Sequence, residues 1–354
     1  VTSTLDSIIY NFKNIREGEY EIIAIKDEAG NYLFDQNIDK IGFIDKPIKL
    51  PNDSIIDLTI FKENENFSWG RPFFVNKNRL GIQYYGDLKN MKELKLISEV
   101  PEKFVSLINK DRVKDTLNYW FKGLDVDSLQ FSLQGIDTIR SSTVKFRKSK
   151  EKDSLTVRSL TGGVIEFKDT FKIFSNIPIM EVKKEFINII NLDSTQIPFE
   201  AKIDENHDII NILFEVEPND EYKISIYPDA INDFFDNPID SLSYKVQSRD
   251  REYYGNIFLQ LIRDTAESFI LELLDKDFNV VRKQKKSNEI DLYIFRHLTP
   301  GDYYIRYIKD LNNNGRWDTG NYLKKLQPEK VFYHPNKLEL RSNWDLNENF
   351  FIEK

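Results

Sequence analysis

Apolar and polar residues alternate along most of this chain, in short segments separated by clusters of Asp, Asn, Ser and Pro. Clear examples are residues 20–24, 209–214, 223–226 and 303–308. Such alternation places every second side chain on one face of a strand, so that one face is buried and the other meets water. Residues 110–121 are the best candidate for a long amphipathic helix. The pattern therefore predicts an all-β protein built from sandwiches.

The length of 354 residues exceeds what one hydrophobic core usually organises, which indicates several domains. Polar links or turns at residues 62–68, 161–163 and 248–252 are the candidate boundaries. The first unit looks short for a complete sandwich, so we expect its leading strands to lie upstream of Val1. The expected units are residues 1–66, 67–160, 161–247 and 248–354.

A 24-residue segment occurs twice in the chain. Residues 12–35 align without gaps on residues 295–318, at an offset of 283, and nine of the 24 positions are identical. Chance supplies about one or two identities over such a length at ordinary composition. Gly18 and Gly301 turn the chain into the strand of each copy. We therefore expect the chain to begin and end with related domains.

The second copy of the repeat ends in an Asp- and Asn-rich loop, DLNNNGRWDTG. Side-chain oxygens at alternate positions of a tightly curled loop converge on one point, and glycine at the sixth position permits the sharp turn. The alternative is a metal-free turn held by hydrogen bonds from its own Asp and Asn side chains. The loop predicts a structural calcium site with the ligands Asp310, Asn312, Asn314, the carbonyl of Arg316, and Asp318.

The matching loop of the first copy, DEAGNYLFD, is a weaker calcium candidate. It has Ala29 where the second copy has a ligand and Tyr32 where the second copy has glycine. We expect this loop to be free of metal. Its candidate ligands are Asp27, Asn31 and Asp35, with Asp39 as a further candidate.

Residue types that carry catalysis are absent or scattered. The chain has no cysteine, which excludes disulfides, a cysteine nucleophile and cysteine-bound zinc. His207, His297 and His334 are far apart in sequence, and no nucleophile elbow, phosphate-binding loop or dinucleotide-binding motif is present. We therefore expect that the protein is not an enzyme.

Charge and hydropathy argue against two classes of partner. Acidic residues outnumber basic ones by 58 to 50, and no basic cluster with interleaved aromatics is present to bind phosphates. Apolar runs are far shorter than the roughly 20 residues that a membrane-spanning helix needs. We therefore expect neither nucleic-acid binding nor a transmembrane segment.

Exposed aromatic rings are the other candidates for function, because they can stack on sugars or form a protein interface. Trp120 lies in DTLNYWF and Trp317 aligns with Phe34, and both positions are typical of a core. Trp69 stands next to a Gly-Arg-Pro sequence near a polar linker. We expect Trp69 to be exposed and to be a candidate binding residue, with tyrosine pairs at 84–85 and 253–254 as further candidates.

Several short motifs follow one another in an order typical of one protein family. Through these motifs and their order, the chain resembles the C-terminal part of the Bacteroidota cell-envelope lipoproteins that carry SbsA-type Ig-like domains. The resemblance covers most of the chain and is most specific over about the last 60 residues. The motifs are GEY (18–20), DKIGFI (39–44), RP (71–72), DTLNYW (115–120), PGDYYIRYIKDLNNNGRWDTGNY (300–322), QPEKVFY (327–333) and RSNWD (341–345).

The resemblance implies tandem Ig-like and prealbumin-like β-sandwich domains, with residues 161–247 as the SbsA-type Ig-like domain. The two end units would be prealbumin-like, or carboxypeptidase-regulatory-like, sandwiches. It also implies a non-enzymatic lipoprotein of the outer membrane, tethered through an upstream lipidated Cys that is not in this chain. The segment DFFDNP (233–238) departs from the family pattern, because it replaces an expected glycine-containing turn.

Three functions follow as competing expectations. The first is a rigid rod of sandwiches that serves as scaffold or subunit of an outer-membrane protein complex, such as a transport or barrel-assembly machine. The alternative is a carbohydrate- or peptide-binding surface module, which requires an exposed aromatic strip or cleft. The third is a hydrolase, which requires a concave site with two carboxylates about 5 to 10 Å apart.

Overall fold

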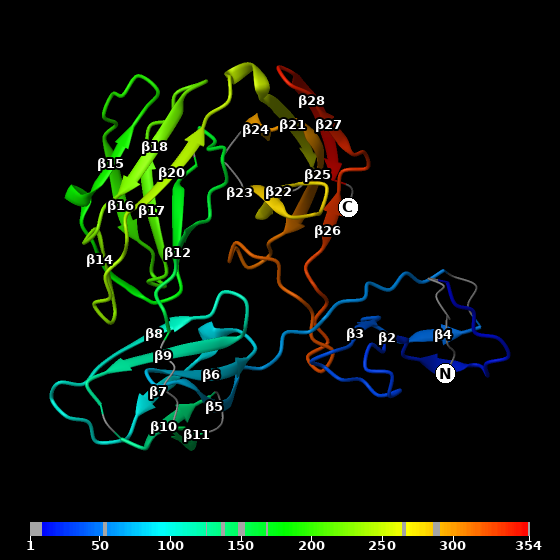
Figure 1. Cartoon of the computed structure of the whole chain (residues 1–354). Helices are drawn as coiled ribbons and strands as arrows, with labels where there is room; N and C mark the ends of the chain where they lie inside the picture. Colours follow the sequence, from blue (N-terminus) through cyan, green and yellow to red (C-terminus); the bar gives the residue numbers. More distant parts are fainter. Residues whose placement is uncertain are drawn as a thin grey trace.

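The computed structural model describes residues 9–51, 55–124, 126–135, 139–147, 153–167, 169–263, 267–285 and 291–352. Within these residues the chain forms 28 strands, which confirms the all-β class of tandem β-sandwiches (Figure 1). The described helices are three single turns of 3-10 helix: Leu88–Asn90 (η1), Lys184–Phe186 (η2) and Arg251–Tyr253 (η3).

The second sandwich packs a four-stranded sheet, in the order β5-β6-β9-β8, on a three-stranded sheet, in the order β11-β10-β7. Its core is rich in aromatic residues, including Tyr84, Tyr119, Phe121 and Phe131. The strands are β5 (Ser68–Asn76), β6 (Arg79–Tyr85), β7 (Glu93–Leu96), β8 (Val105–Lys110), β9 (Thr116–Lys122), β10 (Ser128–Gln134) and β11 (Ile139–Lys145).

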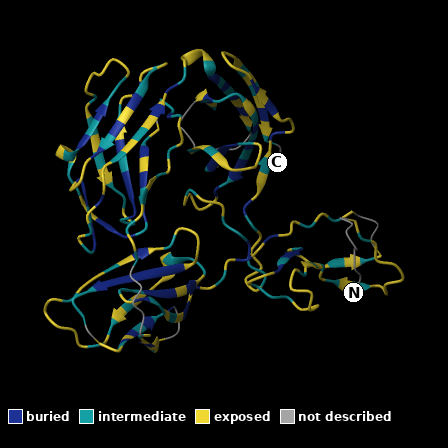
Figure 2. Cartoon of the chain, in the orientation of Figure 1, coloured by how far each residue is buried: buried dark blue, intermediate teal, exposed yellow. Residues whose placement is uncertain are grey.

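The expected helix at residues 110–121 is wrong, because this segment belongs to the antiparallel hairpin of β8 and β9. All of Thr116 to Phe121 is buried, as Figure 2 shows for this strand. One face of β9 packs into the sandwich core, and the other face places Trp120 against Ile177 and Phe234 of the third sandwich. Because both faces are buried, the strand lacks alternation and cannot be told from a helix by its pattern.

The third sandwich faces a four-stranded sheet, β12-β13-β17-β16, with a three-stranded sheet, β15-β18-β20. Its core consists mainly of isoleucine, which fits the pleated, buried surface of a sheet. Strand β12 lies before residue 160 but pairs with β13, so this sandwich begins earlier than expected. The strands are β12 (Val157–Ser159), β13 (Phe171–Ser175), β14 (Ile179–Val182), β15 (Ile187–Ile190), β16 (Phe199–Ile203), β17 (Ile209–Phe214), β18 (Glu221–Ile226), β19 (Ile231–Asp233) and β20 (Leu242–Gln247).

The fourth sandwich packs the sheet β24-β21-β28 on the sheet β23-β22-β25-β26, in which β27 also pairs with β25. Strand β25 is central, because β22 pairs with one of its edges and β26 and β27 pair one after the other with the opposite edge. The strands are β21 (Gly255–Arg263), β22 (Phe269–Leu274), β23 (Val280–Lys285), β24 (Leu292–Leu298), β25 (Gly301–Lys309), β26 (Val331–Tyr333), β27 (Leu338–Leu340) and β28 (Asp345–Ile352).

The first unit, residues 9–66, forms only two short strand pairs in its described part. β1 (Gly18–Tyr20) pairs with β4 (Ile48–Leu50), and β2 (Ile23–Lys26) pairs with β3 (Lys40–Phe43). Its buried core is small, and a tyrosine from the fourth sandwich packs against it. The core residues are Ile41, Phe43 and Phe61, with Phe34 and Tyr322 at the edge.

Strand pairing in the first and fourth units agrees with the sequence repeat. β1 and β2 together correspond to β25 at the offset of 283. Gly18 faces Leu50 in the first unit, and Gly301 faces Leu340 in the fourth. The partner strands β3 and β4 therefore correspond to β26 and β27 at a larger offset of 290, so the loop between the shared strands is seven residues longer in the fourth unit.

The units do not form the extended rod that the sequence suggested. The chain turns back, and the long loop between β25 and β26 reaches from the fourth sandwich to the first unit (Figure 1). The physical reason is that this loop packs Tyr322 against the small core of the first unit and forms hydrogen bonds with it.

Candidate functional site

The loop of residues 310–329 holds the predicted calcium ligands, and it begins directly after β25. Asp310, 1% exposed, accepts hydrogen bonds from the backbone N–H groups of Asn314 (3.0 Å) and Gly315 (2.8 Å). Gly315 has a φ of +76°, a conformation that glycine adopts without strain. The buried carboxylate thus curls the chain back on itself at the point where the strand ends.

The two asparagines close the loop on its second carboxylate. Asn312 and Asn314 donate from Nδ2 to Oδ2 of Asp318, at 2.5 and 2.6 Å. Oδ1 of Asn312 accepts the N–H of Asn314, and Oδ1 of Asn314 accepts the N–H of Arg316. These bonds fix the orientation of both amides, so that nitrogen and not oxygen is directed at Asp318.

Glu329 also belongs to this loop, although the motif did not single it out. Its Oε1 accepts the N–H of Leu311 (2.8 Å), and its Oε2 accepts the N–H of Asp318 (3.0 Å). Burial raises the pKa of Glu329 above its usual range, and the charges of Asp318 and Asp310 add to this rise, although the two N–H bonds oppose it. The loop therefore gathers three carboxylates, of which Glu329 is the one whose pKa is raised.

The donor set fits calcium only in part. The side-chain oxygens of Asp310, Asn312, Asn314 and Glu329 are engaged with backbone N–H groups, and Asp318 accepts two amides. In the described part of the chain, no group of three or more His, Cys, Asp or Glu side chains is arranged to hold a metal ion. The geometry is that of a turn held by its own hydrogen bonds, and calcium binding stays a prediction.

The first-copy loop repeats most of this network, except for the two bonds of Asn312, whose position is taken by Ala29. Asp27 accepts the N–H groups of Asn31 (3.3 Å) and Tyr32 (2.8 Å), as Asp310 does for the equivalent residues. Asn31 donates from Nδ2 to Asp35 at 2.7 Å, as Asn314 does to Asp318. Tyr32 has the positive φ of the equivalent glycine, +60°. The two loops are therefore built in the same way.

The seven additional residues of the second loop lie between Asp318 and Glu329 and contact the first unit. We call residues 319–328 the clasp. Thr319 donates its hydroxyl to the carbonyl of Lys62 at 2.6 Å. Gln327 donates to the carbonyl of Phe43 and to the carboxylate of Asp45, both at 2.8 Å. The backbone N–H of Tyr322 donates to the carboxylate of Glu63, which is 5% exposed.

Apolar packing completes the clasp. The ring of Tyr322 meets that of Phe43 edge to face, at 5.3 Å between centroids. Gly320 lies so close to the first unit that a Cβ there would come within 2.6 Å of the Phe61 ring. The Nζ of Lys325 stands 4.3 Å from the centroid of the Tyr322 ring. Just before the clasp, Arg316 pairs with Asp87 of the second sandwich at 2.8 Å. One loop therefore holds the fourth unit to two others.

A second contact joins the second and third sandwiches. Arg112 pairs with Asp208, whose side chain is 7% exposed, and with Asp204. Trp120 donates from its ring nitrogen to Asn109 at 2.8 Å and lies in the apolar cluster between the two sandwiches. This contact has a buried apolar centre and a charged rim, which is the usual layout of a specific protein interface.

Trp69 is not exposed, contrary to expectation. It is 7% exposed in β5, and its ring nitrogen donates to the carbonyl of Gln134 at 3.1 Å. The segment after it is a bulge in the pairing of β5 with β6, not a linker, which is why Gly and Pro occur there. Tyr84 and Tyr254 are buried as well.

Trp317 departs from expectation in the other direction, since it is 41% exposed. Its ring nitrogen donates to the carbonyl of Glu329 at 3.0 Å. Trp344 is 50% exposed, and the guanidinium of Arg341 lies over its ring at 5.0 Å. Trp120 is buried, as its sequence context predicted. The exposed tryptophans are therefore Trp317 and Trp344, whereas the sequence pattern indicated Trp69.

A polar hollow of about 440 Å³ lies where η3 meets β21 and β28. Asp345 is its single acidic side chain, and Asn256 donates to that carboxylate at 2.7 Å. Glycoside hydrolysis requires two carboxylates across one site, and this hollow does not bring such a pair together. Its lining residues are Arg251, Tyr254, Asn256, His297, Asn343 and Asp345.

Among the described residues, no helix has the length and apolar character to cross a membrane.

No family model and no curated protein matches the sequence, so the likeness to envelope lipoproteins stays a prediction. Among solved structures, the chain is similar to a titin fragment at 11% identity and a TM-score of 0.20, over 68% of this chain and 92% of that one. The Bacillus anthracis TIE protein gives 11% and 0.18, over 58% and 41% of the two chains. The four N-terminal Ig domains of Dscam1 give 10% and 0.19, over 81% and 78%. Such TM-scores carry no argument about function, and the fold rests on the strands and cores themselves.

Proposed function

We propose that this chain is a non-enzymatic scaffold whose sandwiches are held in one arrangement, so that they present a fixed surface to another protein. The clasp is the observation that carries this proposal. It includes the seven residues by which the second loop is longer than the first, and its side chains contact the first unit. A loop that binds domains of its own chain maintains geometry, and a fixed geometry favours recognition because less freedom is lost on binding.

The family resemblance supports the finer form of this proposal. In that form the protein belongs to the bacterial cell envelope and is a subunit of an outer-membrane protein complex, held at the membrane by a lipidated Cys upstream. Its role is transport or the assembly of membrane proteins, and its partner is an outer-membrane protein. Sugar binding is the alternative: Trp69 is buried, so an aromatic platform would have to use the exposed rings of Tyr85, Trp317 or Trp344.

A pull-down from crosslinked outer membranes tests the proposal. We expect the wild-type chain to recover an outer-membrane protein in stoichiometric amount. Gly320→Val displaces the clasp, because the added side chain meets the ring of Phe61, and it should reduce recovery at least tenfold. Gly162→Ala is the matched control, since no atom lies within 4 Å of its Cβ position. Recovery of no partner by the wild-type chain would contradict the proposal.

A further inference from the structure

The polar hollow of the fourth sandwich is built from three segments of the chain that the fold brings together. β21 and β28 run side by side and parallel, with Asn256 opposite Asp345 (Figure 1). η3 and β24 add the remaining walls, together with the loop before β28. The volume of about 440 Å³ lies within the range of small-ligand sites, which is roughly 300–1,000 Å³. The hollow therefore has the size of a site for a small ligand.

Hydrogen bonds fix the polar groups at the centre of the hollow. The Nδ2 of Asn256 donates to Oδ1 of Asp345 at 2.7 Å, and its Oδ1 accepts the backbone N–H of His297 at 3.2 Å. The ring of His297 meets the ring of Phe167 edge to face, at 5.5 Å between centroids. The amide of Asn256 and the carboxylate of Asp345 are therefore held in one orientation, so less freedom is lost when a ligand binds to them.

Two further polar side chains line the hollow and are not used by the fold. Within the described ranges of the chain, neither the guanidinium of Arg251 nor the amide of Asn343 forms a hydrogen bond or an ion pair. Their backbones are nevertheless held in place. The N–H of Asn343 donates to the carbonyl of Tyr254 at 2.9 Å, and the carbonyl of Arg251 accepts the N–H of Tyr254 at 3.2 Å. Both side chains therefore start from a fixed backbone and end in groups that are available to a ligand.

The charges of the hollow select the class of ligand. Arg251 and Asp345 carry opposite charges, so an anion meets a repelling carboxylate and a cation meets a repelling guanidinium. The amides of Asn256 and Asn343 each contain both a donor and an acceptor. A neutral ligand with adjacent hydroxyl groups satisfies such a lining, because each hydroxyl donates to one group and accepts from another. Neutral sugars are ligands of this kind.

We propose that this hollow is a binding site for a neutral sugar unit of a glycan. The carboxylate of Asp345 accepts from the hydroxyls of the sugar, and the guanidinium of Arg251 and the amide of Asn343 donate to them. Asp345 is the one carboxylate among the described lining residues, so the pair that glycoside hydrolysis requires is not formed there. The glycan is therefore bound without being cleaved. The site adds a second kind of partner to the scaffold function and does not depend on it.

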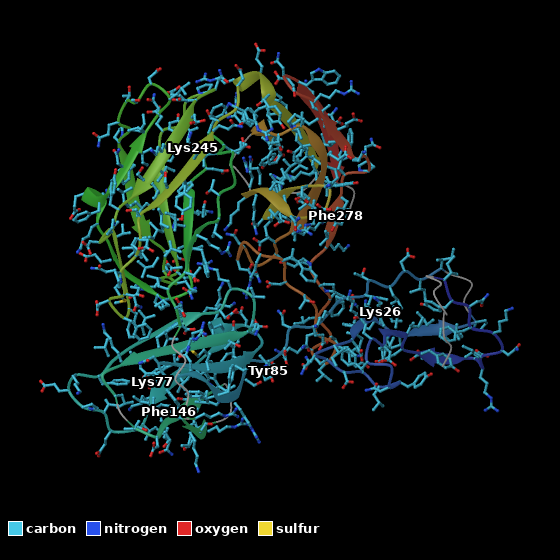
Figure 3. All side chains as sticks on the ribbon, viewed as in Figure 1. Lys26, Lys77, Tyr85, Phe146, Lys245 and Phe278 are labelled. Carbon is cyan, nitrogen blue, oxygen red and sulfur yellow. The ribbon has the colours of Figure 1, made fainter. Side chains whose placement is uncertain are left out.

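An exposed ring elsewhere in the fourth sandwich is the competing place for a sugar. Phe278, labelled in Figure 3, is 53% exposed in the turn between β22 and β23. Its ring stacks on that of Tyr304 at 4.7 Å between centroids, so one of its faces is covered. The neighbouring side chains of Asp275 and Asn279 bond to each other at 3.1 Å. This ring therefore stands beside polar groups that the turn already uses, and the hollow is the better supported site.

An array of neutral and sialylated oligosaccharides tests the site on the full chain, and titration calorimetry then measures the neutral glycan that binds best. We expect the wild-type chain to bind neutral glycans and not sialylated ones. Asn343→Gly keeps the positive φ of +55° and removes the amide, so it should weaken binding about fivefold with an unchanged circular dichroism spectrum. Phe278→Ala is the matched control at the competing ring, and it should bind as the wild type does.

The selection by charge is tested at Asp345. Asp345→Asn keeps an oxygen that accepts from Asn256 but removes the negative charge, so it should weaken the neutral glycan about tenfold and raise the binding of sialylated glycans relative to it. Four results would overturn the proposal: no glycan bound by the wild-type chain, a wild-type preference for sialylated glycans, undiminished binding by Asn343→Gly, or loss of binding in Phe278→Ala. The pull-down above detects a protein partner, so failure on the array leaves the scaffold proposal standing.

Discussion

Asp39 and Glu329 occupy the same place in the two copies of the loop and perform the same task. Each lies directly before the second shared strand, and each accepts backbone N–H groups from the loop that it closes. The environments differ, however. Hydrogen bonds from backbone N–H groups, led by that of Asp35, lower the pKa of Asp39, whereas burial raises the pKa of Glu329. The donors are Glu28, Ala29 and Asp35 in the first loop, and Leu311 and Asp318 in the second.

The two loops should therefore respond to pH in opposite directions. A raised acid pKa means that the Glu329 contribution is complete below the unfolded value of 4.5 and is lost as pH rises through the folded pKa. A lowered pKa means that the Asp39 contribution is present above 3.8 and is lost as pH falls through its folded pKa. Hydrogen exchange of the Leu311 and Glu28 amides, corrected for intrinsic pH dependence, measures both effects. Equal responses of the two loops would contradict this assignment.

Displacing the clasp should loosen the first unit without unfolding the sandwiches. Gly320→Val forces a side chain against Phe61 and against the carbonyl of Leu326, and such overpacking costs about 1–3 kcal/mol. We expect a larger radius of gyration in small-angle scattering and faster hydrogen exchange in residues 40–43. Gly162→Ala should leave both unchanged. An unaltered radius for Gly320→Val would show that the first unit is held by other contacts.

Substitution of one residue, Arg112, should break the contact between the second and third sandwiches and lower the free energy of unfolding. Arg112→Ala leaves the carboxylate of Asp208 largely buried with its main cation removed. Because Arg112 is itself 42% exposed, water offsets part of the loss, and we expect about 1–2 kcal/mol of destabilisation in urea unfolding. Arg341→Ala removes a pair that is about 60% exposed on both sides and should cost under about 0.5 kcal/mol. Equal losses in the two variants would argue against a fixed interface.

Trp69 should behave as a core residue. Trp69→Ala removes a buried ring that lies edge to face with Phe67 at 5.1 Å, and the cost should be about 3–5 kcal/mol. Trp344→Ala, at an exposed position, should cost less than about 1 kcal/mol. Thermal unfolding followed by calorimetry compares the two. A mild effect of Trp69→Ala would restore the ring as a candidate for binding.

Calcium binding by the second loop stays a prediction with a direct measurement. If the ion binds, the melting temperature of the fourth sandwich should rise when calcium is added. The free energy of unfolding should increase by about 2.7 kcal/mol at a hundredfold excess of calcium over the dissociation constant. Asp318→Asn lowers the ligand charge and should reduce this rise. Asp310→Ala is a poorer test, because Asp310 holds the turn with or without an ion. No change with calcium or chelator would establish the metal-free turn.

Alternation and repetition in the sequence predicted the strands and the kinship of the end units, because both depend on local pattern. Positions buried from two sides escaped prediction. β9 lacks alternation because Trp120 faces a neighbouring sandwich, and no local pattern reports that contact. Trp69 was misjudged because a bulge and a linker share the same Gly and Pro residues.

The site was predicted in outline and missed in its detail. Spacing of Asp and Asn identified both loops, yet the carboxylate that closes the second loop lies eleven residues beyond Asp318, after the clasp. A sign of it existed in the sequence, since a second alignment shifted by seven residues places Glu329 on Asp39. The contacts of the clasp depend on how the chain turns back, and pattern alone does not encode that path.

The packing of Tyr322 against the first unit also sets an order of events during synthesis. A ribosome completes residues 9–66 long before it reaches the aromatic ring that packs beside Phe43. The first unit therefore emerges before the loop that completes it, and it stays partly exposed while three sandwiches are made after it. A truncation that removes Tyr322 should for this reason loosen the first unit, which lies far from it in sequence.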